Sequence, residues 1–149
     1  MPPRLGSIYS ERLLMSDVLI LAARLLLATL FLIFGWRKLM DFSGTVSQMV
    51  QLKAPAPVLA AAVATFMELP VAFAIAVGAL TRPLALLMFL YALGTALIGH
   101  RFWTEKGTQR VDSMDSFFKN LSIMGGFLLL FVTGPGKYSI DALFNIAVP

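Results

Sequence analysis

The chain has 149 residues, of which 58% are hydrophobic and only 13% are charged, and its mean hydropathy is +0.82. Soluble domains carry about 25% charged residues, so this composition excludes an ordinary soluble domain and predicts an integral membrane protein. The net charge of +4 does not predict nucleic-acid binding, because many basic residues lie at the ends of apolar runs, where they set orientation against a bilayer.

The chain contains no cysteine and one histidine. Thiol–disulfide relays, cysteine-ligated iron–sulfur clusters and thiolate metal sites all need cysteine, and bis-histidine haem ligation needs a second histidine. We therefore expect no metal site and no haem, iron–sulfur or thiol cofactor. The sequence contains no recognisable set of nucleophile, base and orienting group for hydrolysis by a serine or a carboxylate. It does not indicate whether the chain is an enzyme of another kind.

Four apolar stretches follow one another, each close to the length of about 20 residues that a helix needs to cross a bilayer. They cover about residues 17–40, 57–80, 84–100 and 117–133. Ser16 and Asp17 are the predicted N-cap of the first helix, because their side-chain oxygens can accept the free amides of a helix start. The sequence predicts an all-α integral membrane bundle of four transmembrane helices, forming a single domain over residues 1–149.

The connections between these stretches carry turn and start signals. Pro57 marks the start of the second helix, where its missing N–H is harmless. Pro70 lies inside the second span and is a candidate kink. Residues 100–116 form the long polar loop, and Gly134-Pro135-Gly136 ends the fourth helix.

Arg24 and Glu68 interrupt the first and second apolar runs. A lone charge at membrane depth costs about 2.5–3.5 kcal/mol on insertion scales, so such residues usually pair in a protected interior and mark a working site. At 1.5 Å per residue, Arg24 lies about 21 Å from Lys38 and Glu68 about 16 Å from Pro57, both counted from the same membrane side. The sequence therefore predicts an Arg24–Glu68 ion pair, with a purely structural role in helix registry as the alternative.

A second polar level is expected nearer the loops. Lys38 ends the first span, His100 ends the third, and Lys119 and Asn120 open the fourth, so an antiparallel bundle puts them on one side. The alternative is that the two lysines extend to the membrane surface and that the His100 ring lies among headgroups. The count of basic residues favours cytoplasmic loops with both termini outside.

Several motifs recur in a fixed order along the chain. They are Arg24 with Leu30-Phe31 and Gly35-x-x-Lys38, Glu68 followed by Gly78, His100, Phe118-Lys119-Asn120-Leu121, Gly125-Gly126, Gly134-Pro135-Gly136 and Ser139-Ile140-Asp141. In this order and spacing the chain resembles the DoxX family of small four-span bacterial membrane proteins over about residues 18–143. The resemblance implies a multi-pass protein of the bacterial cytoplasmic (inner) membrane. The family takes its name from a subunit of a thiosulfate:quinone oxidoreductase.

The leading functional hypothesis is a quinone-interacting or accessory subunit of a membrane redox system, with a redox protein as partner and the lipid bilayer around it. Quinone carbonyls need hydrogen-bond donors beside an apolar slot. The candidate ligand-binding residues are Arg24, Lys38, Glu68, His100, Lys119 and Asn120, with Phe31 and Phe127 as flat walls. A small proton-coupled transporter and a non-catalytic scaffold for a partner enzyme are the alternatives. The sequence does not determine whether the protein forms an oligomer.

Overall fold

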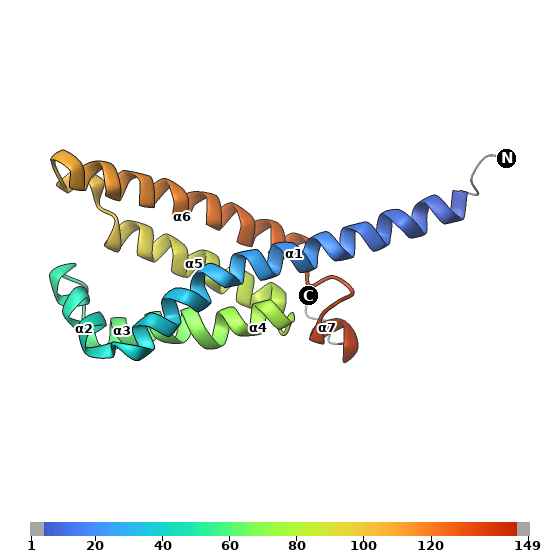
Figure 1. The fold of residues 1–149 in the computed structure, drawn as a ribbon, viewed down its shortest axis with the longest axis horizontal. Coiled ribbons are helices and arrows are strands. Elements are labelled where there is room, and N and C mark those ends of the chain that lie inside the picture. The colour runs from blue at the N-terminus through green and yellow to red at the C-terminus, as the bar shows by residue number, and fades with distance from the viewer. Residues whose placement is uncertain (1–4, 146–149) are drawn as a thin grey trace.

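The computed structural model describes the backbone of residues 5–145 and the side chains of residues 14–145, and this part of the chain is helical without strands. Its elements are α1 (Leu5–Met40), α2 (Phe42–Gln51), α3 (Pro57–Phe66), the π-helix η1 (Met67–Val71), α4 (Ala72–Val77), α5 (Thr81–Gly99), the short 3₁₀-helix η2 (Phe102–Thr104), α6 (Gly107–Thr133) and α7 (Ile140–Leu143). Figure 1 shows α5 and α6 side by side, with α1 crossing between them and the rod formed by α3, η1 and α4.

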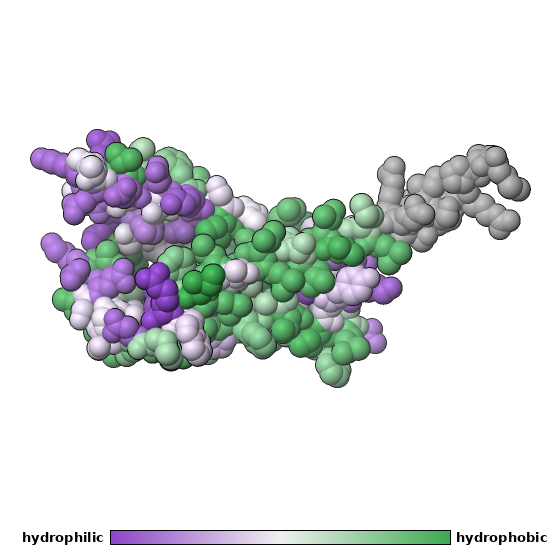
Figure 2. All heavy atoms as spheres, viewed as in Figure 1, coloured by the Kyte–Doolittle hydropathy of each residue, from purple (hydrophilic) through white to green (hydrophobic). Residues whose placement is uncertain are grey.

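Four helical stretches among the described residues are long and apolar enough to cross a membrane: Leu14–Met40, Pro57–Val77, Thr81–Thr104 and Gly107–Thr133. The predicted all-α bundle of four transmembrane helices is therefore confirmed. Figure 2 shows a wide apolar region across the middle of this face and polar residues gathered at the end that carries the loops between α1 and α3 and between α5 and α6. We call this the loop end.

Two expected helix starts differ from the structure. α1 runs without a break through Ser16 and Asp17, so the predicted N-cap there is wrong. The Asp17 carboxylate instead accepts a hydrogen bond from the backbone N–H of Lys137 at 3.0 Å. α6 begins at Gly107, ahead of the expected start at 117, so much of the expected polar loop is helix that extends beyond the apolar stretch.

Pro70 leads to a π-helix within the second span. Proline has no backbone N–H, so the carbonyl one turn earlier loses its usual donor and the helix can widen. Residues Met67–Val71 take this wider form, and Glu68 lies inside it. Wider turns of this kind occur often at functional sites.

Small residues let α1 approach the second span closely. A Cβ atom on Gly35 would lie 2.7 Å from the backbone carbonyl carbon of Glu68, so a side chain there would force the two helices apart. Around this contact lies an apolar core that includes Phe31, Ile75 and Phe127. The close approach brings the C-terminal part of α1 against η1.

Candidate functional site

Arg24 and Glu68 are both buried, with 1% and 6% of their surfaces exposed, but they do not pair. The sequence-based ion pair is wrong because it placed the start of the second span level with the end of the first. In the structure Glu68 packs against Gly35, which is 11 positions beyond Arg24 and so about 16 Å farther along α1. Each charge therefore finds different partners at a different depth.

Glu68 binds two side chains from two other helices. Lys38 of α1 contacts Oε2 of Glu68 at 2.5 Å, and the hydroxyl of Tyr91 on α5 donates to Oε1 at 2.5 Å. We call Lys38, Glu68 and Tyr91 the Glu68 cluster. Both carboxylate oxygens have a donor, and the ammonium compensates the negative charge, which is how an ionised group is retained away from water.

The Glu68 cluster is not sealed. The Lys38 side chain is 19% exposed and that of Glu68 is 9% exposed. The Lys38 ammonium also lies 5.6 Å from the centre of the Phe34 ring, a distance at which a cation is attracted to an aromatic face. The Glu68 cluster is therefore reachable from outside the bundle through Lys38.

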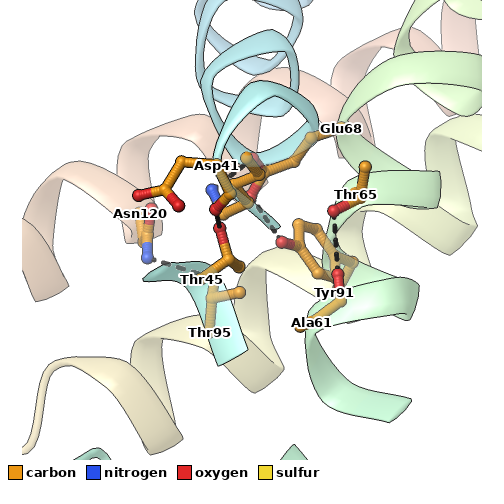
Figure 3. Close-up of polar contacts among 9 residues, drawn as sticks. Asp41, Thr45, Ala61, Thr65, Glu68, Tyr91, Thr95 and Asn120 are labelled. Carbon is orange, nitrogen blue, oxygen red and sulfur yellow. Dashed lines mark hydrogen bonds and ion pairs between the residues drawn. The ribbon is translucent and has the colours of Figure 1, made fainter. Parts of the chain in front are cut away.

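Further polar side chains gather near the cluster (Figure 3). Thr45 lies on α2, Thr65 on α3, Thr95 on α5 and Asn120 on α6. The Asn120 amide donates to the Thr95 hydroxyl at 3.3 Å, and the Thr45 hydroxyl donates to the carbonyl of Asp41 at 2.9 Å. Side chains from every spanning helix therefore meet in this region.

The other predicted donors lie apart from the cluster. His100 is the C-cap of α5 and is half-buried, and the charges that act on it are those of Glu105 and Lys119. Lys119 itself is exposed. The structure thus brings Lys38 and Glu68 into contact, bonds Asn120 to Thr95 in the same polar region, and leaves His100 near the charge of Lys119 instead.

Two aromatic residues differ from their predicted role as walls of an open slot. The rings of Phe31 and Phe127 have centroids 5.6 Å apart and are buried in the core. The ring of Phe31 also lies 6.4 Å from that of Tyr91. The sequence analysis did not single out Tyr91, because an aromatic residue within an apolar run packs equally well in a core or against lipid, and nothing along the chain shows that a carboxylate lies beside it.

Arg24 is bound by backbone carbonyls at the opposite end of the bundle from the loops. Its guanidinium donates to the carbonyls of Tyr138 at 2.6 Å, of Ala76 at 3.4 Å and of Pro135. Two of these carbonyls belong to the segment after α6. Arg24 therefore fastens the C-terminal segment to α1 and α4, and we call this the Arg24 anchor.

A glycine and a carboxylate complete the anchor. Gly78 ends α4 with φ of 75°, and a Cβ there would collide with the Arg24 guanidinium and with Ser139. The buried carboxylate of Asp141 accepts the backbone N–H groups of Leu80 at 2.7 Å and Thr81 at 2.9 Å, at the start of α5. A negative charge there satisfies free amides and complements the helix dipole.

Comparisons with known proteins agree with this architecture. The chain is 51% identical over 124 residues to inner membrane protein YphA of Escherichia coli, which covers 83% of this chain and 89% of that protein. It is 40% identical over 131 residues to inner membrane protein YqjF of the same organism, covering 88% of this chain and 95% of that protein. No solved structure matches it significantly. The DoxX family model matches residues 19–101, and the chain is a multi-pass inner-membrane protein that belongs to the DoxX family.

Proposed function

We propose that this protein is the membrane subunit of a redox system and that its Glu68 cluster binds the head group of a quinone. The observation that supports this most is the meeting of an ammonium, a phenol and a carboxylate, from three helices, at a partly exposed point within the apolar bundle. Ionisable residues at membrane depth usually serve a ligand or proton pathway.

The chemistry of the three groups suits a quinone. A quinone carbonyl accepts hydrogen bonds, and both Lys38 and Tyr91 are donors that already point at one small region. When either donor turns to a carbonyl of the head group, Glu68 loses one hydrogen bond and has a free lone pair for another donor. The chain holds no cysteine for an iron–sulfur cluster, so electrons come from a partner protein in this proposal.

An apolar groove offers room for a quinone tail. It has a volume of about 620 Å³ and lies between residues 19–30 of α1 and 123–133 of α6. The groove ends at Leu30, next to Phe31, whose ring packs near that of Tyr91. An amphiphile with an apolar tail and a polar head has matching surfaces along this side of α1.

A quinone titration on the purified protein in lipid nanodiscs tests the proposal. Tyr91→Phe removes one donor to the head group, and Glu68→Gln removes the negative charge that holds the Lys38 ammonium in place. We expect each change to raise the dissociation constant for ubiquinone with a short alkyl tail about 10-fold, the effect of losing one or two good hydrogen bonds. Tyr138→Phe and Glu105→Gln are matched controls outside the cluster and should leave the constant unchanged. Absence of saturable binding to the unsubstituted protein would retire the quinone proposal.

A proton-coupled transporter is the second candidate. It is favoured by the polar side chains of Thr45, Thr95 and Asn120, which lie near Glu68 at the loop end (Figure 3). Proteoliposomes that take up a solute or move protons in a Glu68-dependent manner would support it. Uptake that is equal with Glu68→Gln would exclude Glu68 from any such path.

A further inference from the structure

α2 packs against α3 and α1 near the Glu68 cluster, with a single buried residue. Thr45 is the buried residue among its ten positions. Figure 3 shows Thr45 and the N-cap residue Asp41 in the same polar region as Glu68 and Tyr91. A helix with so little buried surface belongs to the less stable part of a fold and can move while the spans stay in place.

The end of α2 is built on strained backbone. The N–H of Lys53 bonds to the carbonyl of Val50 at 3.0 Å and that of Ala54 to the carbonyl of Met49 at 3.0 Å, which is the pattern of a Schellman helix end. Lys53 holds the left-handed position at φ of 53°, where glycine is usual, and Ala56 follows at φ of 47°. Such strain persists only where surrounding contacts hold it.

One contact from another loop holds this turn. The guanidinium of Arg101, just after α5, donates to the carbonyl of Leu52 at 2.7 Å. Leu52 is the C-cap of α2, next to the strained Lys53. The hydrogen bond therefore joins the loop between α1 and α3 to the loop between α5 and α6 at the point where α2 meets α3.

We propose that α2 is a lid over an entrance to the Glu68 cluster, hinged at Lys53 and Ala56 and held shut by Arg101. When the Arg101 bond breaks, α2 swings away, Thr45 becomes exposed, and water reaches the side chains beneath from the loop end. This proposal depends on the proposed function only for the identity of the molecule that enters, since the opening motion can be measured without any ligand.

The absence of cysteine allows a direct test of opening. Thr45→Cys puts a thiol on the covered face of α2, and Ser47→Cys puts one on its exposed face. In nanodiscs, a water-soluble maleimide should label position 45 slowly and position 47 quickly. Adding Arg101→Gln should speed labelling at position 45 at least threefold and leave position 47 unchanged, while the matched Arg110→Gln should change neither rate.

A second variant separates lid opening from general loosening of the fold. Glycine takes the left-handed conformation without strain, so Lys53→Gly should stabilise the shut lid and slow labelling at position 45 at least twofold. A loosened fold would give faster labelling instead. An unchanged rate at position 45 with Arg101→Gln, or a faster rate with Lys53→Gly, would overturn the lid, and the second result decides alone if Arg101→Gln fails to fold.

The two proposals fail separately. Quinone binding that is absent while the labelling rates change as expected removes the quinone and keeps the lid. Quinone binding that depends on Tyr91 while the labelling rates do not respond to Arg101 or Lys53 removes the lid and keeps the site.

Discussion

The two charged residues buried in the spans, Arg24 and Glu68, are held in opposite ways. Arg24 is 1% exposed and bonded to backbone carbonyls, which cannot titrate or rotate away. Glu68 is bonded to the side chains of Lys38 and Tyr91, and Lys38 is partly exposed. A buried charge held by carbonyls stabilises one arrangement of the chain, whereas one held by ionisable side chains, one of them partly exposed, is placed to take part in chemistry.

The comparison predicts that the largest loss of stability comes from the Arg24 anchor. Arg24→Met leaves the carbonyls of Pro135 and Tyr138 without their donor, and we expect the free energy of unfolding to fall by about 2–4 kcal/mol. Denaturation of the purified protein in detergent, followed by circular dichroism, measures this. An Arg24→Met protein as stable as the unsubstituted one would show that the anchor does not hold the fold.

Gly78 should come next. Gly78→Ala adds a Cβ against Arg24 and Ser139 at a left-handed φ, so we expect a loss of about 2–3 kcal/mol from strain and overpacking together. Gly94→Ala is the control, because a Cβ there meets open space. Equal stability of the two variants would contradict the close packing around the Arg24 guanidinium.

Gly35 gives the corresponding change at the Glu68 cluster. Gly35→Ala pushes α1 away from the backbone of Glu68, and we expect about 1–3 kcal/mol of destabilisation. Because Lys38 lies on the same helix one turn away, the variant should also weaken quinone binding, which Gly78→Ala should leave nearly unchanged. Titration of both variants with the same short-tailed quinone measures this difference in affinity. An equal loss of binding in Gly35→Ala and Gly78→Ala would contradict a binding site at the Glu68 cluster.

The smallest effects are expected at His100 and Lys119, which were predicted from the sequence as ligand-binding residues. His100→Gln and Lys119→Met lie away from the Glu68 cluster, so each should change the free energy of unfolding by no more than about 0.5 kcal/mol. Quinone affinity should stay within about twofold of the unsubstituted value, less than 0.5 kcal/mol. A 10-fold loss of affinity in either variant would move the binding site toward His100.

Sequence patterns predicted the helices well and the pairing of polar residues poorly. The long apolar runs and the proline and glycine signals predicted four spans, because those depend on neighbours along the chain. The partners of Glu68 depend on how far one helix slides along another. That offset is set by the close contact of Gly35 with the backbone of Glu68 and by α2, the additional helix between the first and second spans. Neither feature follows from the periodicity of the sequence.

Burial of Arg24 and Glu68 was predictable because charge in an apolar run is costly to leave in lipid. The Arg24 anchor was not, because its acceptors are backbone carbonyls more than 50 positions away. Carbonyls are present at every residue and leave no mark in a sequence. The glycine and proline after α6 indicated a turn there, and only the fold shows that the turn carries acceptors for Arg24.

Double-mutant cycles on the free energy of unfolding test most directly whether Glu68 belongs with Lys38 or with Arg24. One cycle combines Glu68→Gln with Lys38→Met, and the other combines Glu68→Gln with Arg24→Met. We predict a coupling of about 1 kcal/mol or more for the first and less than about 0.5 kcal/mol for the second, since contacting charges couple and distant ones add. Strong coupling between Arg24 and Glu68, with none between Lys38 and Glu68, would contradict the separation of the Arg24 anchor from the Glu68 cluster.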